Sequence, residues 1–479
     1  MFRAPELLGP SQGQLDSGKA ELLRSLGSRV LFDDEISEDY RSDDSRILGE
    51  RPLAVVLAES SSDIEAALTI AAAHKIPVVP RAGGSGRTGG AVPLCRGIVL
   101  ATAGMTELHE LDAREGLVRV GPGARLSEVQ AAVEREGWLY PPDPNSAELC
   151  CIAGNVAENA AGPRAFKYGA TRDYVLGIET ILAGGQKFFA GRRTRKGVTG
   201  YDVVSLLVGS EGTLAVFGDI TLKLIPKPEE VLTLAATFPS LSHALGAVGA
   251  LVQAQVPARC LEFLDEKTLS VMRQSGVPLA PSAEALLIIE VDGSEAECEH
   301  QAERILAICE HCRAIEVQVA LLASARAQLW DARKQMSRAV RARARHKISE
   351  DVVVPRRELL RLVDCVRELG DKYSIDALSY GHAGDGNLHV NFLWNEPEEE
   401  TKVALAVREL FVTTLSLGGT LSGEHGIGLL KAEYLPLEHP EPLLDLERRL
   451  KSTFDPLGIM NPGKIFPSEP GARAGHGAC

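Results

Sequence analysis

The feature that most restricts the fold is a glycine-rich loop with no helix behind it. Gly84-Ser-Gly86-Arg-Thr-Gly89 follows the apolar run 76–80 and has the spacing G-x-G-x-x-G. In a Rossmann fold a helix begins at such a loop, so that its first amide groups face a pyrophosphate. Here Gly90 and Pro93 come next, followed by a strand-like run at 97–100. The sequence therefore excludes the Rossmann fold at this position.

The loop is able to bind an anion without a helix. Its backbone amides, with the side chains of Arg81, Ser85, Arg87 and Thr88, can point into one concavity. A mobile surface loop would be the alternative if no similar cluster accompanied it.

Two further polar clusters accompany the loop in the same half of the chain. One is Pro141-Pro-Asp-Pro-Asn-Ser146 with the run 152–162, and the other is the run 206–214, interpreted as a strand that ends in a Gly-Ser-Glu-Gly turn. Glycine allows close approach to a ligand, and the amides of Asn155 and Asn159 suit phosphate or ribose oxygens. Three glycine turns predict a long, extended ligand.

The first half of the chain reads as one α+β unit over residues 35–226. Its pattern predicts a strand at 53–57, a helix at 63–74 and a strand at 76–80, with further strands at 174–183 and 214–224. The crossover helix implies parallel pairing of the first strands.

The second half reads as a separate unit over residues 227–420. Pro226 and Pro228 mark its beginning. The order β-α-β-β-α-β then predicts an antiparallel sheet with helices on one face. Residues 421–466, which include a helix, are expected to return to the first unit. Residues 1–34 form an N-terminal segment, and the Gly- and Pro-rich tail 467–479 is expected to be disordered.

Composition limits the classes of partner. With 51 Lys and Arg against 65 Asp and Glu, the net charge is −14, which disfavours nucleic-acid binding. No apolar run reaches 18 residues and no signal peptide is visible, so we expect a soluble cytoplasmic protein, peripheral to a membrane at most through a partner. Nine scattered cysteines indicate reduced thiols.

Two histidines flank a tight turn in the second unit. His382-Ala-Gly-Asp-Gly-Asn-Leu-His389 reads as two strands joined in a hairpin, which places the two imidazoles across from each other. Period-2 alternation places Asn391 on the same face as His389. Packing is the usual role of a lone histidine, but this pair forms half of a metal site.

A second glycine turn, Ser422-Gly-Glu-His-Gly426, provides the natural third ligand, Glu424. Neighbouring side chains in an extended turn point apart, so His425 is free to face a substrate and act as a general base. Imidazoles and one carboxylate suit zinc, manganese and ferrous iron alike. Taken alone, this set also allows a metallohydrolase.

A carboxylate substrate needs a cation. Arg333 and Ser337 lie one turn apart on an expected helix and can hold a carboxylate together. Lys347 is a further candidate, although a solvated basic helix face explains it equally well.

Five segments, 81–90, 141–146, 154–159, 167–169 and 209–212, resemble the PCMH-type FAD-binding domain of the vanillyl-alcohol-oxidase superfamily. The resemblance extends over residues 30–466. Within the superfamily the chain is most similar to the group of glycolate oxidase D-subunits, D-lactate dehydrogenases and D-2-hydroxyglutarate dehydrogenases. It implies an α+β fold with two α+β subdomains around FAD and a cap domain.

The resemblance also assigns residues. It implies noncovalent FAD, because Ser85 stands where covalent members carry a linking histidine. It supports a metal at His382, His389 and Glu424, and Arg333 against the substrate carboxylate. The expected FAD contacts are Arg81, Gly83, Gly84, Ser85, Gly86, Thr88, Gly89, Gly90, Pro142, Asp143, Ser146, Gly154, Asn155, Asn159, Gly162, Glu211, Gly212 and Asn461.

The expected function is an FAD- and metal-dependent dehydrogenase that oxidises a D-2-hydroxy carboxylate by hydride transfer to flavin N5. Arg333, Ser337, Lys347 and Asn391 would bind the substrate, and the D configuration rests on the resemblance alone. The acceptor would be a quinone, an electron-transfer flavoprotein or an iron–sulfur subunit, because no cysteine cluster can hold an iron–sulfur centre. The metal is expected to be zinc, and a homodimer is possible.

Two other functions fit the same fold. One is non-redox adduct chemistry of the ether-lipid-synthase kind. The other is a flavin subunit of a multi-subunit glycolate oxidase, or a subunit without catalysis of its own.

Overall fold

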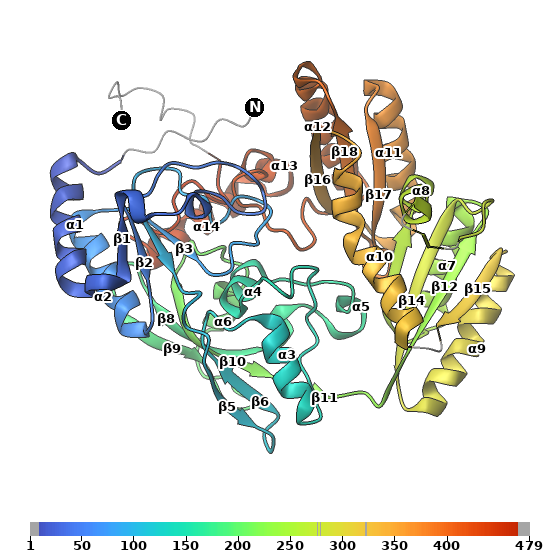
Figure 1. Ribbon diagram of the computed structural model, residues 1–479, viewed down its shortest axis with the longest axis horizontal. Coiled ribbons are helices and arrows are strands. Elements are labelled where there is room, and N and C mark those ends of the chain that lie inside the picture. The colour runs from blue at the N-terminus through green and yellow to red at the C-terminus, as the bar shows by residue number, and fades with distance from the viewer. Residues whose placement is uncertain (1–8, 275, 278, 321–322, 468–479) are drawn as a thin grey trace.

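The computed structural model describes residues 9–467 apart from 275, 278, 321 and 322. The expected disordered tail lies almost wholly outside the described residues. Two bodies face each other, one built on two sheets and one on a single large sheet (Figure 1). They correspond to the two α+β units expected from the sequence, while the residue boundaries of the expected domains stay predictions.

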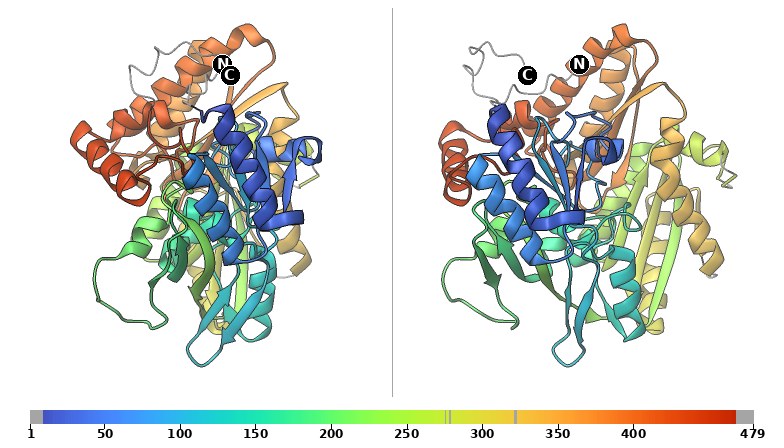
Figure 2. Two further views of the ribbon diagram at one scale, coloured as in Figure 1. Left: turned by 90° about the vertical axis from the view of Figure 1, so that its left-hand side faces the viewer. Right: turned by 60° about the vertical axis from the view of Figure 1, so that its left-hand side comes forward.

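The first sheet has the order β1-β2-β4-β3. The strands β2, β4 and β3 are parallel and β1 is antiparallel. Parallel pairing of the first strands was predicted, and β4 lies between β2 and β3. Helix α2 connects β2 to β3, and α1 packs on α2 (Figures 1 and 2). The bounds are α1 Gln12–Leu26, β1 Val30–Phe32, β2 Ala54–Leu57, α2 Ser61–His74, β3 Val78–Arg81 and β4 Ile98–Ala101.

The second sheet is antiparallel, in the order β5-β6-β10-β8-β9. A small pair, β7 with β11, lies beside it. The bounds are β5 Leu108–Asp112, β6 Leu117–Val120, α3 Leu126–Arg135, β7 Trp138–Leu139, α4 Ile152–Glu158, α5 Ala165–Tyr168, β8 Val175–Ile181, β9 Lys187–Gly191, α6 Val203–Leu207, β10 Val216–Lys223 and β11 Ile225–Pro226.

Two expected local structures in this unit were wrong. The run before Gly209 is the helix α6 and not a strand, because Asp202 caps it by accepting the backbone N–H of Ser205 and a short apolar run does not distinguish the two. The run around Gly154 is the helix α4 and not a turn. It ends at Asn159, which adopts a left-handed conformation with φ of 51°.

The third sheet is antiparallel throughout, in the order β15-β12-β14-β13-β17-β18-β16. Its first strands follow the predicted order. The bounds are β12 Glu230–Phe238, α7 Leu241–Gln253, β13 Ala258–Leu264, α8 Glu266–Gln274, β14 Ala285–Gly293, α9 Glu295–His311, β15 Glu316–Ala320, α10 Ala323–Arg341, β16 His346–Val353, α11 Leu359–Tyr373, β17 Asp376–His382, β18 Asn387–Trp394 and α12 Glu400–Ser416.

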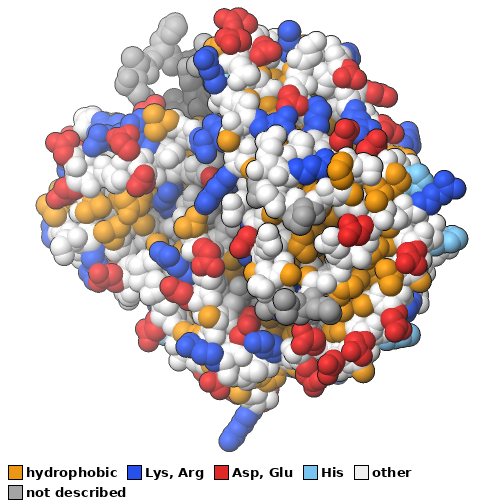
Figure 3. Space-filling view, turned by 45° about the vertical axis from the view of Figure 1, so that its right-hand side comes forward, with side chains coloured by type: hydrophobic (Ala, Val, Ile, Leu, Met, Phe, Trp, Pro, Cys, Tyr) orange, Lys and Arg blue, Asp and Glu red, His pale blue; other side chains and the backbone are white. Residues whose placement is uncertain are grey.

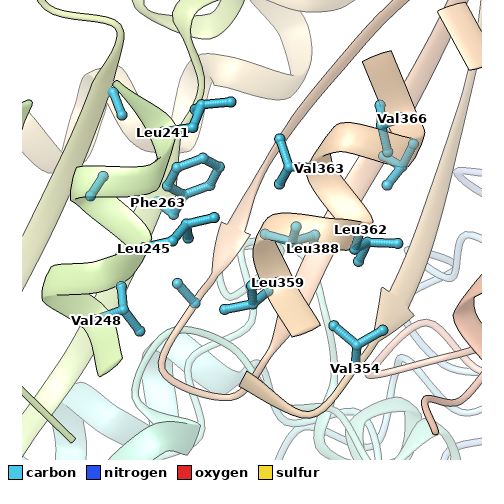
Figure 4. Packing of buried hydrophobic residues seen from close by; sticks show 14 of the residues in the cluster. Leu241, Leu245, Val248, Phe263, Val354, Leu359, Leu362, Val363, Val366 and Leu388 are labelled. Atoms are coloured by element: carbon cyan, nitrogen blue, oxygen red, sulfur yellow. The ribbon is translucent and has the colours of Figure 1, made fainter. Parts of the chain in front are cut away.

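Four helices, α7, α9, α11 and α12, cover one face of this sheet, as predicted. Their apolar side chains pack with the sheet in one cluster, in which Leu241 and Leu245 lie near Phe263, and Leu362 near Leu388 (Figure 4). The helices α8 and α10 cover the opposite face, so the prediction that helices lie on one face alone was wrong. Because α10 lies on the side of the first body, its side chains reach the space between the bodies (Figure 1).

The end of the chain returns to the first body, as expected from the sequence. Helices α13 (Leu435–Glu438) and α14 (Glu441–Phe454) lead to Met460, which bridges to Val78 of β3. No described helix is long and apolar enough to cross a membrane. On the face shown in Figure 3, acidic and basic side chains are intermixed, in keeping with the expected spread of charge.

Candidate active site

A cavity of about 670 Å³ lies between the two bodies. Its size falls within the range of ligand pockets, about 300–1,000 Å³. The glycine turns of the first body form one wall, and the third sheet with α10 forms the other. Of the expected FAD contacts, it is lined by Arg81, Gly83, Gly84, Ser85, Gly86, Gly90, Asp143, Ser146, Gly154, Asn155, Gly162, Glu211 and Gly212.

The first loop is shaped by glycine where a side chain would collide. Gly84 has φ of 64°, and a Cβ there would lie 2.3 Å from the guanidinium of Arg81. A Cβ on Gly83 would lie 2.5 Å from the carbonyl oxygen of Leu149. Helix α4, which also lines the cavity, carries a polar group without a hydrogen-bond partner: Nδ2 of Asn155 is buried and unpaired. A buried donor facing a cavity suits phosphate or ribityl oxygens, so these residues fit FAD.

Five expected FAD residues do not line the cavity: Thr88, Gly89, Pro142, Asn159 and Asn461. Three of them hold the lining turns. Nδ2 of Asn461 donates to the carbonyls of Gly90 and Glu211, at 2.9 and 2.8 Å. Oδ1 of Asn159 accepts the backbone N–H of Arg172 at 2.9 Å. The hydroxyl of Thr88 donates to the carbonyl of His425 at 3.1 Å. This bond connects the first loop to the turn 422–426, called the histidine turn below.

The two hairpin histidines and Glu424 converge. Strands β17 and β18 form the predicted hairpin, but in its register His389 pairs with Tyr380 and His382 with Asn387, so the histidines are diagonal and not directly opposite. Their ring centroids are 5.2 Å apart. Oε1 of Glu424 lies 3.6 Å from Nε2 of His382 and 3.5 Å from Nε2 of His389.

This cluster fits a metal ion. One potential ligand atom from each of the three residues lies within 4.8 Å of the others. Oε2 of Glu424 is buried and has no hydrogen-bond partner. Ligands at about 2.0–2.2 Å from one zinc ion lie somewhat more than 3 Å apart, close to the observed spacing. A buried carboxylate with a free oxygen between two imidazoles is therefore suited to a divalent cation.

His425 lies closer to this cluster than expected. The prediction that its side chain points away from Glu424 was wrong: its Nε2 lies 3.7 Å from Oε1 of Glu424, and its ring stacks on His389 at 5.2 Å. The turn is not extended, because it wraps around Asp351. Oδ2 of Asp351 accepts the backbone N–H groups of Gly423, Glu424 and His425 at 2.8, 2.7 and 3.0 Å.

His425 is electrostatically suited to accept a proton. Burial lowers its pKa below the ordinary value, the positive charge of Arg87 acts in the same direction, and Asp351 opposes both. The imidazole is therefore neutral near pH 7 and available as a base.

Two carboxylates beside the candidate metal ligands were not predicted from the sequence. Glu262 is wholly buried on β13; its Oε1 lies 2.5 Å from Nδ1 of His382, and its Oε2 accepts from Nε of Arg333 at 2.7 Å. Burial raises the pKa of Glu262, but the opposing effect of Arg333 and His382 is larger and brings the pKa down to about 2. Asp351, also buried, lies 3.8 Å from Nδ1 of His389.

A carboxylate hydrogen-bonded to the far nitrogen of a metal-ligating histidine orients the ring, and Glu262 is placed for this role at His382. Nδ1 of His389 has no hydrogen-bond partner, so Asp351 acts on that ring through its charge. For Glu262 the available signal was a single acidic residue within the strand Ala258–Leu264; Asp351 follows Glu350 and had no such signal.

The expected substrate residues divide into two sets. Arg333 and Ser337, on α10, line the cavity, and Arg333 lies over the ring of Tyr380 at 4.9 Å. Lys347 and Asn391 do not line it. Nζ of Lys347 donates to Oγ of Ser337 at 3.1 Å, and burial together with Arg87 and Arg341 lowers its pKa to about 7. Asn391 donates to the carbonyl of His389 and has a buried, unpaired Oδ1.

Two family models cover most of the chain. An FAD binding domain matches residues 52–188, and the C-terminal domain of FAD linked oxidases matches residues 227–465. Curated relatives match over nearly their whole length. Glycolate oxidase subunit GlcD of Bacillus subtilis is 37% identical over 94% of this chain and 95% of its own. D-lactate dehydrogenase of Archaeoglobus fulgidus is 35% identical over 90% and 96%.

Solved structures share the fold. Alkyldihydroxyacetonephosphate synthase has a TM-score of 0.75 at 19% identity, covering 95% of this chain and 87% of its own. p-Cresol methylhydroxylase has a TM-score of 0.76 at 15% identity, covering 95% and 98%. The expected fold and family are confirmed. The chain therefore belongs to the FAD-linked oxidase family, as an FAD-dependent oxidoreductase of the group that includes glycolate oxidase subunit GlcD, D-lactate dehydrogenase and D-2-hydroxyglutarate dehydrogenase.

Proposed function

We propose that the protein oxidises the C2 hydroxyl of a D-2-hydroxy carboxylate, such as lactate, glycolate or 2-hydroxyglutarate, to the 2-oxo acid. One observation carries the proposal: the His382–His389–Glu424 cluster, His425 and Arg333 line the same cavity as the flavin-binding turns. A cation-binding cluster, a neutral base and a buried guanidinium are together the groups that hold a hydroxy acid and remove its hydroxyl proton.

The proposed cofactors are noncovalent FAD and one divalent ion, zinc or alternatively manganese or ferrous iron. When bound, the FAD accepts two electrons as a hydride at N5, and the ion stabilises charge on the substrate oxygens. Ser85 lines the cavity, and the resemblance to the family places it where covalent members carry the linking histidine. His382, His389 and Glu424 would hold the ion.

The substrate carboxylate is held by Arg333 in this proposal. Glu262 engages Nε and Nη2 of Arg333, so Nη1 is the nitrogen left to bind the carboxylate. Ser337 follows one turn later on α10, and its hydroxyl oxygen accepts a hydrogen bond from Nζ of Lys347. Asn391, the fourth residue expected to bind the substrate, does not line the cavity and would act indirectly, through its hydrogen bond to the carbonyl of His389.

His425 takes the hydroxyl proton. Its carbonyl is held by Thr88 and its backbone N–H by Asp351, so the imidazole is fixed between the flavin loop and the metal cluster. A fixed base with a lowered pKa transfers the proton without reorganisation of the loop.

The electrons must then leave to an acceptor. A quinone, an electron-transfer flavoprotein and an iron–sulfur subunit remain the candidate acceptors, and two of the relatives are named as glycolate oxidase subunits. We propose that the protein works with such a partner.

The test is anaerobic titration of the holoenzyme with matched D- and L-2-hydroxy acids while the flavin absorbance is followed. We expect bleaching by a D acid only. His425→Ala should keep FAD and metal and lose the bleaching, whereas His300→Ala, at an exposed position on α9, should behave as the parent. Unchanged bleaching in the His425 variant would remove the base assignment, and no bleaching by any 2-hydroxy acid would remove the proposed substrate class.

A further inference from the structure

The loop between β9 and α6, residues 192–202, projects from the first body (Figure 2). Every residue from 193 to 202 is exposed. Val198 and Tyr201 are 98% and 97% exposed, the most extreme values among the large apolar side chains of the described residues. Both side chains are almost wholly accessible to solvent and are therefore available to a partner.

Further apolar side chains are exposed on the two elements that flank the loop. Phe188 and Phe189 on β9 are 37% and 49% exposed, and Leu206 on α6 is 41% exposed. Helix α6 packs against β9. Strand β9 is the last strand of its sheet, so its outer edge has no neighbouring strand in the described part of the chain. Aromatic side chains beside an open strand edge form a surface on which another protein can dock.

The same loop concentrates positive charge. Arg192, Arg193, Arg195 and Lys196 lie within five residues of a chain whose net charge is −14. Arg193 is paired with Glu110, and Arg195 and Lys196 make no ion pair within the described residues. A cationic rim around an apolar centre attracts a partner with an acidic surface.

The loop is connected through helix α6 to the part of the cavity that is lined by Glu211 and His425. Helix α6, about 8 Å long, leads from the loop to the turn that carries Glu211. The guanidinium of Arg172 holds this helix through the carbonyls of Ser205 and Val208, at 2.6 and 2.8 Å. Glu211 in turn accepts the backbone N–H groups of Ile427 and Gly428, next to His425.

We propose that residues 188–206 are the docking surface for an acidic electron-carrier protein that reoxidises the reduced FAD. This inference rests on the proposed function, which requires such an acceptor. Two electrons leave the reduced FAD, the redox group of the carrier accepts them, and the protons of the reduced FAD pass to water. A second copy of the chain is a poorer occupant, because a two-fold pair would bring two cationic loops together.

The probe is a purified electron-transfer flavoprotein with an acidic surface. Its binding to the oxidised holoenzyme gives a Kd, and stopped-flow mixing with dithionite-reduced holoenzyme gives the rate of flavin reoxidation. The test variants are R195E/K196E and Tyr201→Ser. The control is K402E/R408E, which reverses two exposed cations on α12, on the other body.

We expect the Kd to rise by at least about tenfold in R195E/K196E, and to become less sensitive to salt. Reoxidation by the carrier should slow by a similar factor. Reoxidation by the small acceptor dichlorophenolindophenol should not change, since it needs no docking surface. The control should match the parent in all three measurements.

Several results would overturn the proposal: no binding of the carrier, equal Kd for parent and variant, or an equal loss in the control. Two other occupants are distinguishable. Loss of binding to phosphatidylglycerol vesicles, with the carrier unaffected, would assign the loop to a membrane, and a dimer that dissociates in R195E/K196E would assign it to a second copy. Because dithionite reduces the flavin, a failure to oxidise 2-hydroxy acids would affect only the proposed function.

Discussion

Glu262 accepts a hydrogen bond from Nε of Arg333 at 2.7 Å. The same carboxylate contacts Nδ1 of His382 through its other oxygen. One buried side chain thus positions a residue proposed to bind the substrate and a residue proposed to bind the metal. Both would be displaced together if this carboxylate were lost.

We therefore expect Glu262→Gln to weaken metal binding and to raise KM. An amide carries no charge to balance Arg333 and His382, and loss of such a supporting group costs roughly 10–100-fold in metal affinity or activity. Metal content, KM and kcat are the measurements, with Glu266→Gln, at an exposed position on α8, as the control. A purely structural role would lower the thermal stability and leave KM and metal affinity unchanged.

Asp351→Asn should unfold the histidine turn locally. Oδ2 of the carboxylate accepts three successive backbone N–H groups, and Oδ1 accepts Nδ2 of Asn387. An amide would place its NH2 group against one of these two sets of donors. Removing one partner of a buried charged network costs about 3–5 kcal/mol. Denaturant unfolding should show this loss, with Asp364→Asn, at an exposed position on α11, unchanged. Equal unfolding midpoints would contradict the structural role of Asp351.

The pH dependence of stability should also reflect Asp351. Burial raises its pKa, but His425, Lys431 and His389 lower it well below the ordinary value in the folded state. A lowered carboxyl pKa stabilises the fold above the unfolded pKa of about 4, and this contribution is lost as the pH falls below it. The difference in stability between the parent and Asp351→Asn should therefore shrink below pH 4.

Lys347 should limit activity on the alkaline side. Its pKa of about 7 means that it is charged below pH 7 and neutral above, so the attraction for an anionic substrate falls as pH rises. His425, with its lowered pKa, gives the rising limb at acidic pH. We expect a bell-shaped profile of kcat/KM. In Lys347→Arg the falling limb should move to higher pH, and an unchanged limb would exclude Lys347 as its cause.

A chelator should separate the two proposed cofactors. Dipicolinate is expected to abolish flavin bleaching by the substrate while the protein stays yellow, and zinc or manganese should restore bleaching. Glu424→Gln should bind the ion more weakly and need a higher concentration for rescue. Full activity after the metal content has been shown to be zero would remove the metal from the proposed mechanism.

Local pattern predicted the parts of the fold that depend on neighbouring residues. The helix α2, the three parallel strands of the first sheet and the hairpin around His382 follow from periodicity and turn residues, whereas β1 of that sheet was not predicted. The helix α6 was missed because its cap, Asp202, stands before a run too short for periodicity to decide.

Long-range contacts were beyond the same reasoning. Glu262 and His382 are 120 residues apart in sequence, and only the pairing of β13 with β17 brings them together. The position of His425 depends on Asp351, 74 residues away, which draws the turn into a tight wrap. The side-chain directions expected for an extended turn were wrong for that reason.

Thr88 and Glu211 both bind the backbone of the segment that carries His425, and both belong to turns of the flavin body. The segment that carries Glu424 and His425 is thus attached to turns proposed to bind FAD, so it contacts both proposed cofactor sites. By linkage, any factor by which FAD raises the affinity for the ion is also the factor by which the ion raises the affinity for FAD. Enzyme stripped of its ion by dipicolinate should then stay yellow but hold FAD less tightly than the fully loaded enzyme.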